Sequence, residues 1–313
     1  MEREGLRILD RLIWGTVAAV AAVVLAAARM GDFRIAWSTF IAPALACAIL
    51  AMGGYFYSRW RSDPRLASGL LCTAQVIAFA AVGAPLSYIA ASANAPLCDH
   101  WLDAFDRAVG FDWKALLAWM NAAPAVYAVL RPIYLSLTLQ MTIVVLCLAF
   151  SGRLLWLRVY TLAFLCVVLV SIAISAVLPA AGVWPYYGLT AADAQIVPAV
   201  STSWPVFYGL RDGSFRLLVA VGSEGIITFP SVHAALAVIV IAALWPIPVL
   251  RFVAIAINLL MLLATPIDDS HYFVDVAAGG ALAVLALVVA RTIAERACAH
   301  RALITKNALA QSS

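Results

Sequence analysis

Charged residues are scarce in this sequence. They make up only 12% of its 313 residues, whereas 65% of the residues are hydrophobic. A soluble domain carries about 25% charged residues, so this scarcity excludes an ordinary soluble domain. The few basic residues also form no patch of the kind that binds nucleic acid, and we expect no nucleic-acid partner.

Paired cysteines are lacking as well. The six cysteines are scattered, mostly within apolar runs, and none belongs to a C-x-x-C pair. This pattern is typical of small residues in a membrane core rather than of metal ligands or a disulfide framework. Low-complexity segments are absent apart from alanine-rich apolar runs.

What the sequence does have is long apolar runs. Several reach roughly 18 residues, which is long enough for a helix to cross a bilayer. We therefore predict an all-α, polytopic transmembrane helical bundle of about eight spans, at 12–28, 35–57, 66–91, 125–150, 154–178, 231–249, 251–267 and 271–290. The first run is long for a signal-peptide core and lacks an obvious cleavage site, so it counts as a span.

The distribution of Lys and Arg orients these spans, because cytoplasmic loops are enriched in basic residues. An inner N-terminus places 13 of them inside: Arg3, Arg7, Arg11, Arg59, Arg61, Arg65, Arg153, Arg158, Arg251, Arg291, Arg296, Arg301 and Lys306. Six then lie outside: Arg29, Arg34, Arg107, Lys114, Arg211 and Arg216, with Arg131 near the outer end of the fourth span. We therefore expect both termini in the cytoplasm.

This layout divides the chain into three parts. Residues 1–114 would form the first transmembrane helices and an outer loop, 115–295 a catalytic transmembrane core, and 296–313 a basic cytoplasmic tail. Within 92–114, apolar and aromatic residues at helical spacing among four aspartates predict an amphipathic helix at the membrane interface. A second outer loop, 179–230, is rich in Trp and Tyr, which favour the interfacial zone.

The segment GIITFPSVHAALAV places His233 at the start of the sixth span. Pro230 blocks an earlier continuation of the helix, and Ser231 is a suitable N-cap. The free N–H groups and the positive end of the helix dipole make this helix start suitable for an anion such as phosphate. Taken alone, His233 also fits an interfacial histidine at a capped helix end.

The segment DDSHYFVDV places His271 at the start of the last span, with Asp275 at i+4 on the same helix face. A carboxylate bonded to one imidazole nitrogen fixes the tautomer and leaves the other nitrogen free to attack an electrophile. Asp275 falls inside the predicted span, where a carboxylate is costly and points to a function. The alternative is a simple ion pair at a helix start.

Topology brings the two histidines to one membrane face, since the sixth span leaves that face after His233 and the seventh returns to it before His271. A nucleophile, a proton donor and an anion-binding helix end are what phosphoryl transfer needs. The other two histidines, His100 and His300, fit solvated positions in the amphipathic loop and the basic tail.

These motifs resemble those of the type-2 phosphatidic acid phosphatase superfamily. PSVHAA followed by HYFVDVAAGG is similar to its second and third motifs, PSGH and SR-x5-H-x3-D. HYFVD resembles the inositol phosphorylceramide synthase branch, and HY-x-x-DV also occurs in sphingomyelin synthases. GFDW at 110–113 and ITFPSVHAA at 227–235 resemble bacterial members of that branch. The motif-bearing core covers about 200–285, and upstream the resemblance is mainly topological.

The resemblance assigns a role to each matching residue. It implies His271 as the nucleophile that forms a phosphohistidine, Asp275 as its orienting carboxylate, His233 as the acid that protonates the leaving group, and Ser231 as a phosphate contact. It also implies membrane lipids as substrates, an active site on the extracytoplasmic face of a bacterial inner membrane, and no metal cofactor.

Two departures from the family pattern concern phosphate binding. Ala264-Thr265 stands where the phosphatases have Ser-Arg, and Arg131-Pro132 has Pro124 in place of the lysine of the first motif, K-x6-RP. A phosphoryl group still needs cationic stabilisation.

The candidates on the outer side are Arg211, Arg216 and Arg131, in that order, because Arg211 lies where the first motif is expected. The alternative role for each of them is binding of lipid headgroups.

The sequence thus favours an enzyme that acts on phosphate esters of lipids. The missing Ser-Arg pair and the HYFVD form favour headgroup transfer slightly over hydrolysis. Asp268 and Asp269 would line the site and meet a hydroxyl-bearing or cationic acceptor, or alternatively bind a divalent metal. From another class, a transporter or flippase of anionic lipids could use the same His/Asp pocket, although no inverted repeat is evident. Nothing in the sequence indicates an oligomeric state.

Overall fold

The computed structural model describes the backbone of residues 2–190, 192–193 and 203–311, and the side chains of residues 4–299 within those ranges. The helices are α1 (Glu2–Met30), α2 (Ser38–Arg59), α3 (Pro64–Ala91), α4 (Asp99–Ala108), α5 (Trp113–Ala122), α6 (Pro124–Leu135), α7 (Leu137–Phe150), α8 (Leu154–Val177), α9 (Val183–Tyr187), α10 (Ser203–Asp212), α11 (Val232–Leu244), α12 (Pro248–Asp268) and α13 (Phe273–Gln311). The short strands β1 (Arg34–Ile35) and β2 (Leu217–Leu218) pair in parallel. The predicted all-α bundle is confirmed.

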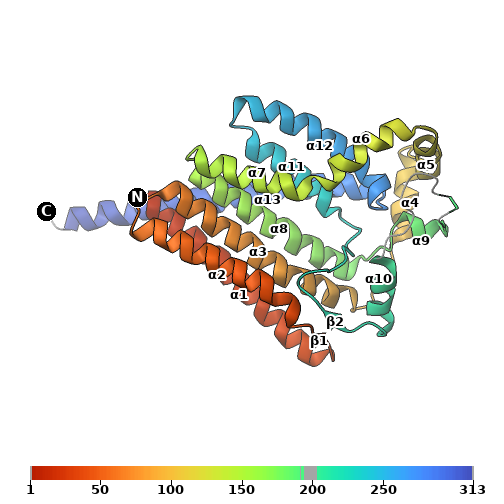
Figure 1. The fold of residues 1–313 in the computed structure, drawn as a ribbon, viewed down its shortest axis with the longest axis horizontal. Coiled ribbons are helices and arrows are strands. Elements are labelled where there is room, and N and C mark those ends of the chain that lie inside the picture. Colours follow the sequence, from red (N-terminus) through yellow and green to blue (C-terminus); the bar gives the residue numbers. More distant parts are fainter. Residues whose placement is uncertain (1, 191, 194–202, 312–313) are drawn as a thin grey trace.

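The long helices run side by side, so the molecule has two ends (Figure 1). Both termini lie at one end, and α4, α5, α9 and α10 lie at the other. Within the described residues, α1, α2, α3, α8, α12 and α13 are long and apolar enough to cross a membrane. A seventh span is possible if α5 and α6, which meet at 110°, form one broken span. The chain is therefore an integral membrane protein.

Two of the eight predicted spans are shorter than expected. The segment 125–150 divides into α6 and α7 at Ser136, whose hydroxyl donates to the carbonyl of Ile133 and competes with the helical pattern. The segment 231–249 yields α11 with only 13 residues. That helix ends at Leu244, because Pro246 has no backbone N–H with which to continue the helical hydrogen bonds.

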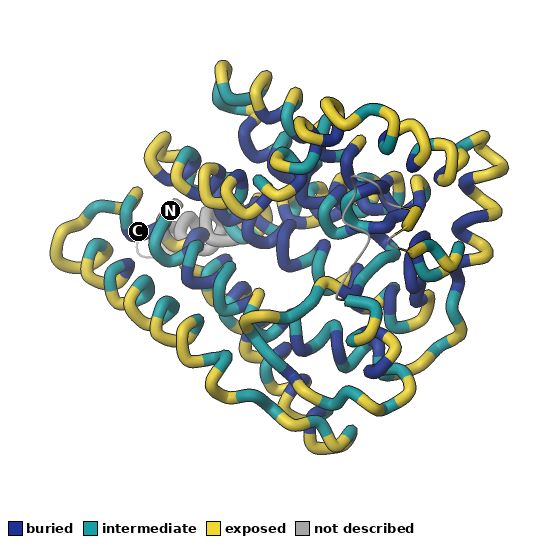
Figure 2. The backbone as a smooth tube through the Cα atoms, turned by 45° about the vertical axis from the view of Figure 1, so that its right-hand side comes forward, coloured by how far each residue is buried: buried dark blue, intermediate teal, exposed yellow. Residues whose placement is uncertain are grey.

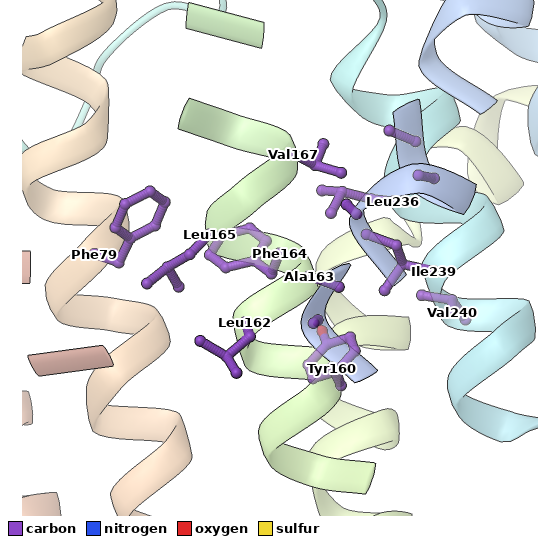
Figure 3. Close-up of a cluster of buried hydrophobic side chains, with 14 of the residues drawn as sticks. Phe79, Tyr160, Leu162, Ala163, Phe164, Leu165, Val167, Leu236, Ile239 and Val240 are labelled. Carbon is purple, nitrogen blue, oxygen red and sulfur yellow. The ribbon is translucent and has the colours of Figure 1, made fainter. Parts of the chain in front are cut away.

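Helix α8 lies at the centre of the bundle, between α3 and α11 (Figure 3). Tyr160 and Phe164 of α8 are buried, and Phe164 meets Phe79 of α3 edge to face. On its other side, α8 faces Ile239 of α11. The exposed residues follow the outward sides of the peripheral helices, whereas buried residues line the interior (Figure 2). The outward side of α2 is apolar, as a surface in contact with lipid requires.

Helix α13 continues beyond the predicted end of its span at residue 290 and includes most of the predicted basic tail. The side chains of that tail from His300 onward lie outside the described residues, as do residues 194–202 of the second outer loop. The division of the chain into three parts remains a prediction.

Candidate active site

His271 lies in the turn between α12 and α13, where its side chain is only 1% exposed. Its Nδ1 is 3.1 Å from Oδ2 of Asp275, one helical turn further along. The same carboxylate oxygen accepts the backbone N–H of Tyr272 at 2.9 Å, which fixes the carboxylate at the start of α13. The predicted pairing of His271 with Asp275 is therefore present, and it leaves Nε2 of His271 facing away from Asp275.

Asp269 connects the two histidines that the sequence singled out. Its Oδ2 lies 3.1 Å from Nε2 of His271 and 3.3 Å from Nδ1 of His233. The Asp269 side chain is 38% exposed, so the carboxylate stands between the buried His271 and the solvent. One anionic oxygen thus occupies the space between the two imidazoles.

Ser231 completes this group from the start of α11. Its hydroxyl lies 3.2 Å from Nε2 of His271 and accepts the backbone N–H of Ala234 as the predicted helix cap. The backbone N–H of Ser231 donates to the carbonyl of Asp275 at 3.1 Å, which joins the first turns of α11 and α13. The N-terminus of α11 therefore points at the space between the histidines, where its dipole favours an anion.

Gly279 allows the two helices to come this close. A Cβ atom at this position would overlap the backbone oxygen of Ser231. At the next residue, Gly280, a Cβ would lie in ordinary contact, 3.8 Å from Cγ2 of Val238. The first of these two glycines is thus the one that the approach of α13 to α11 requires.

His233 is held by an aromatic ring. It stacks on Tyr134 of α6 with 4.6 Å between ring centroids and 22° between planes. The side chain is 36% exposed, in contrast to that of His271. His233 is thus the more accessible of the two histidines.

The protonation of the site follows from these contacts. Burial disfavours the imidazolium form of His271, but the hydrogen bonds to Asp269 and Asp275 together outweigh it and raise the pKa of His271 to about 10. Burial also works against the charged form of Asp269, yet the hydrogen bonds from His233 and His271 lower the pKa of Asp269 well below its ordinary value. The two carboxylates thus favour the protonated form of His271.

One of the two histidines, His233, lines a cavity of about 440 Å³ together with Asp269; the wall is largely apolar but includes Ser87 and Glu224. It lies between the second half of α3 and the second half of α8, along Phe79, Gly83, Phe164 and Val168, and it ends at His233 and Asp269. Ligand pockets of this size are typically apolar with a few polar groups at one end. The cavity fits an apolar chain attached to a polar headgroup.

Helix α4 contributes residues that the sequence analysis did not identify. Oδ1 and Oδ2 of Asp106 accept the backbone N–H groups of Val274 and Phe273 at 2.9 and 2.7 Å, which closes the first turn of α13. Asp99 likewise accepts the N–H groups of Ala181 and Gly182.

The hydroxyl of Tyr272, the residue after His271, also donates to Asp99 at 3.0 Å. The amphipathic helix is present where the sequence predicts one, but Asp99, Asp103 and Asp106 face the protein, while Trp101 and Phe105 are exposed. The spacing i, i+4, i+7 of the three aspartates, which puts them on one face, was the available signal.

A family model described as the PAP2 superfamily matches residues 100–289. The chain belongs to the PAP2 superfamily. The matched range includes Ser231, His233, Asp269, His271 and Asp275. Membership supports phosphatase-type activity on lipid phosphates, and hence a phosphoric ester hydrolase-type enzyme, at a general level. No curated protein and no solved structure matches the chain.

In this PAP2 superfamily member, the three candidate arginines differ in their relation to the site. Arg131 is 40% exposed and pairs with Asp268 at 3.2 Å. Arg211 instead donates to the carbonyl of Ala95 at 2.8 Å. Arg216 donates to the carbonyl of Leu210 at 2.9 Å and lies over the ring of Phe33.

Among the described residues, no hydrogen bond or ion pair joins Arg211 or Arg216 to the histidines. Arg131 pairs with Asp268, the neighbour of Asp269 in the chain. The order of preference among the three arginines remains a prediction.

Asp268 and Asp269 also differ in their relation to the site. Asp268 is buried and accepts hydrogen bonds from Arg131 and from the Tyr127 hydroxyl, rather than facing the space between the histidines. In the described part of the chain, no group of three or more His, Cys, Asp or Glu side chains is arranged to hold a metal ion.

Proposed function

We propose that this PAP2 superfamily member cleaves phosphate esters of membrane lipids through a covalent intermediate on His271. The observation that carries the proposal is the single carboxylate oxygen of Asp269, held between Nε2 of His271 and Nδ1 of His233 beside the N-terminus of α11. An oxygen of a phosphate group would occupy the same position, within reach of the same donors. Asp269 would be displaced as the phosphate enters.

The reaction would proceed in two steps. When substrate displaces Asp269, the Nε2 proton of His271 would pass through the Asp269 carboxylate to the solvent, and Nε2 would attack phosphorus while Nδ1 stays bonded to Asp275. The P–O bond to the leaving alcohol would break, and His233 would give that oxygen its proton. In the second step, water or an alcohol would attack the phosphorus of the phosphohistidine, the P–N bond would break, and the attacking oxygen would pass its proton to His233. Nε2 of His271 would regain its proton from the solvent as Asp269 returns.

The stabilisation of the phosphoryl oxygens would come from the chain itself. The free N–H groups of the first turn of α11 and the hydroxyl of Ser231 are suited to this role, with Arg131 as the preferred cation. Asp268 would hold Arg131 in place, and Asp269 would meet the hydroxyl of an incoming alcohol. The apolar cavity along α3 and α8 would take an acyl chain of the lipid.

We further propose that the acceptor is an alcohol, so that the enzyme transfers a phosphate-linked headgroup. The support is the HYFVD sequence and the lack of the Ser-Arg pair. The excess of basic residues at the opposite end of the bundle supports an extracytoplasmic active site. A lipid extract incubated with the purified protein would separate the alternatives, since hydrolysis releases free phosphate and transfer creates a new phospholipid.

Trapping the intermediate tests the mechanism directly. The protein would be mixed with a lipid whose phosphate is radiolabelled, quenched in alkali, and analysed for acid-labile label on His271. We expect label in the wild type and none in His271→Ala, whereas His233→Ala should slow turnover by about 10²–10⁴-fold. Wild-type turnover by folded His271→Ala would refute the proposal, and a carrier of anionic lipids would give no label in any variant.

A further inference from the structure

A second cavity of about 420 Å³ lies at the end of the bundle opposite the active site. The active-site cavity follows the second halves of α3 and α8, whereas this one follows their first turns, near Pro64 and Leu154. Helices α1 and α2 form its remaining walls, and both of them pack on α3. The cavity is therefore at the end that carries both chain termini (Figure 1).

A buried arginine lines this cavity. The side chain of Arg158 is 3% exposed, and its Nε and Nη2 each lie 3.1 Å from a carboxylate oxygen of Asp10. Its Nη1 is buried and has no hydrogen-bond partner in the described part of the chain. Because an unsatisfied buried cationic donor is costly, such a group calls for a ligand.

The charge balance of the cavity favours an anion. The ion pair of Arg158 with Asp10 is neutral as a unit, and Arg7 adds a positive charge to the lining. Tyr55, Ser58 and Ser68, which carry hydroxyl groups, also line it, and the hydroxyl of Ser58 donates to the carbonyl of Tyr55. Guanidinium and hydroxyl groups together match the oxygens of a phosphate.

The surroundings of the cavity are those of a lipid site. Leu45, Ile49 and Met52 are exposed on the outward face of α2, the same helix that supplies Tyr55 and Ser58. Arg59, Arg61 and Arg65 cluster at the same end of α2 and α3. Basic pockets between transmembrane helices bind anionic headgroups, and the neighbouring apolar surface accommodates the chains.

We propose that this cavity binds the phosphate headgroup of an anionic phospholipid in the leaflet opposite the active site, with Arg158 and Arg7 as its anion ligands. The site is separate from His271 and does not depend on the proposed reaction. It would hold a resident lipid between α1 and α2 and so join two helices at the edge of the bundle.

Binding of phosphatidylglycerol to the delipidated protein in detergent, followed by native mass spectrometry, tests the proposal. Ala51 lines the cavity, whereas Ala48 is exposed on the preceding turn of α2 and does not. We expect Ala51→Phe to lose one bound lipid relative to both wild type and the matched control Ala48→Phe. Arg7→Gln should weaken that binding about tenfold. Arg158 is kept in all variants, because its removal would leave the carboxylate of Asp10 without its ion-pair partner.

Three results would overturn the assignment. Ala51→Phe could bind as many phosphatidylglycerol molecules, as tightly, as Ala48→Phe, which would place the lipid elsewhere. Equal binding of zwitterionic phosphatidylcholine would show that the cavity does not select an anionic headgroup. Displacement of the lipid by excess inorganic phosphate would identify free phosphate as the ligand. Because no variant alters the proposed catalytic residues, lipid-phosphate turnover should remain at the wild-type level in Ala51→Phe.

Discussion

His233 and His271 hold the same oxygen atom, Oδ2 of Asp269, at 3.3 and 3.1 Å. Since the two histidines lie on different helices, this oxygen is the point at which α11 and the turn before α13 are joined electrostatically. In the proposed mechanism, this carboxylate oxygen stands where an oxygen of the substrate's phosphate would bind.

Asp269→Asn should shift the pH dependence of catalysis. The carboxylates around His271 raise its pKa to about 10, and attack requires the unprotonated Nε2. Removal of the Asp269 charge lowers that pKa, so the acid limb of the kcat/KM profile should move to lower pH. Profiles of wild type and variant on one lipid phosphate check this. If the acid limb of the profile did not move, protonation of His271 would not limit kcat/KM in that pH range.

The same pair should make stability depend on pH. A histidine whose pKa rises from 6.5 to about 10 on folding stabilises the folded state fully below about pH 6.5. That contribution is lost as the pH rises towards 10. Thermal unfolding in detergent should therefore show a fall of Tm between these values that is larger for wild type than for Asp269→Asn. Parallel curves for the two proteins would contradict the prediction.

Gly279→Ala should inactivate the enzyme more than Gly280→Ala. The added methyl group at Gly279 would overlap the backbone oxygen of Ser231 and push α11 from α13. A displacement of 1 Å can cost on the order of 10²-fold in rate, which is the loss we expect. The neighbouring Gly280→Ala has room and serves as the matched control. Similar turnover by both variants would show that the close approach is not needed.

Asp106→Ala should destabilise the protein and lower kcat together. It removes the acceptors of two N–H groups at the start of α13, a loss of about 1–3 kcal/mol. Asp103→Ala is the control, because Asp103 lies on the same face but bonds to the side chains of Arg107 and Tyr187 rather than to the backbone of α13. Chemical unfolding and turnover should be measured on both. Equal losses of stability and turnover in the two variants would show that Asp106 does not position His271.

Arg131→Lys should reduce kcat/KM by about 10–100-fold, because a lysine cannot reproduce the planar two-point contact of a guanidinium with phosphate. It keeps a positive charge beside the buried Asp268, so the fold is preserved. Arg216→Lys, which alters an arginine bonded to the carbonyl of Leu210, should have little effect. The kinetics of the two variants, measured side by side, distinguish the candidates. A larger loss in Arg216→Lys would reverse the assignment.

The sequence predicts the helical class and the pairing of His271 with Asp275 because both depend on local periodicity. Hydrophobic runs mark the spans, and an i,i+4 spacing places the carboxylate beside the imidazole. It does not predict the role of Asp269, which depends on how α11 and α13 pack against each other. The overlap of a side chain at Gly279 with the backbone of Ser231 cannot be predicted from the sequence for the same reason.

The aspartates of α4 show a further limit of prediction from the sequence. Their common face is evident from the spacing, but the composition alone does not say whether that face meets water or protein. In the structure they bind backbone N–H groups about 80 and 170 residues away. Only the tertiary arrangement supplies those partners, and the same is true of Arg131 and its distant partner Asp268.

The contact between α4 and α13 has a consequence for biosynthesis. Asp106 leaves the ribosome 167 residues before its partner Phe273, the first residue of the last helix. Until the chain has been synthesised past α12, Asp106 lacks the N–H groups of Phe273 and Val274, and Asp99 lacks the hydroxyl of Tyr272 in the turn before α13. The candidate active site around His271 is therefore the last part of the molecule to be assembled.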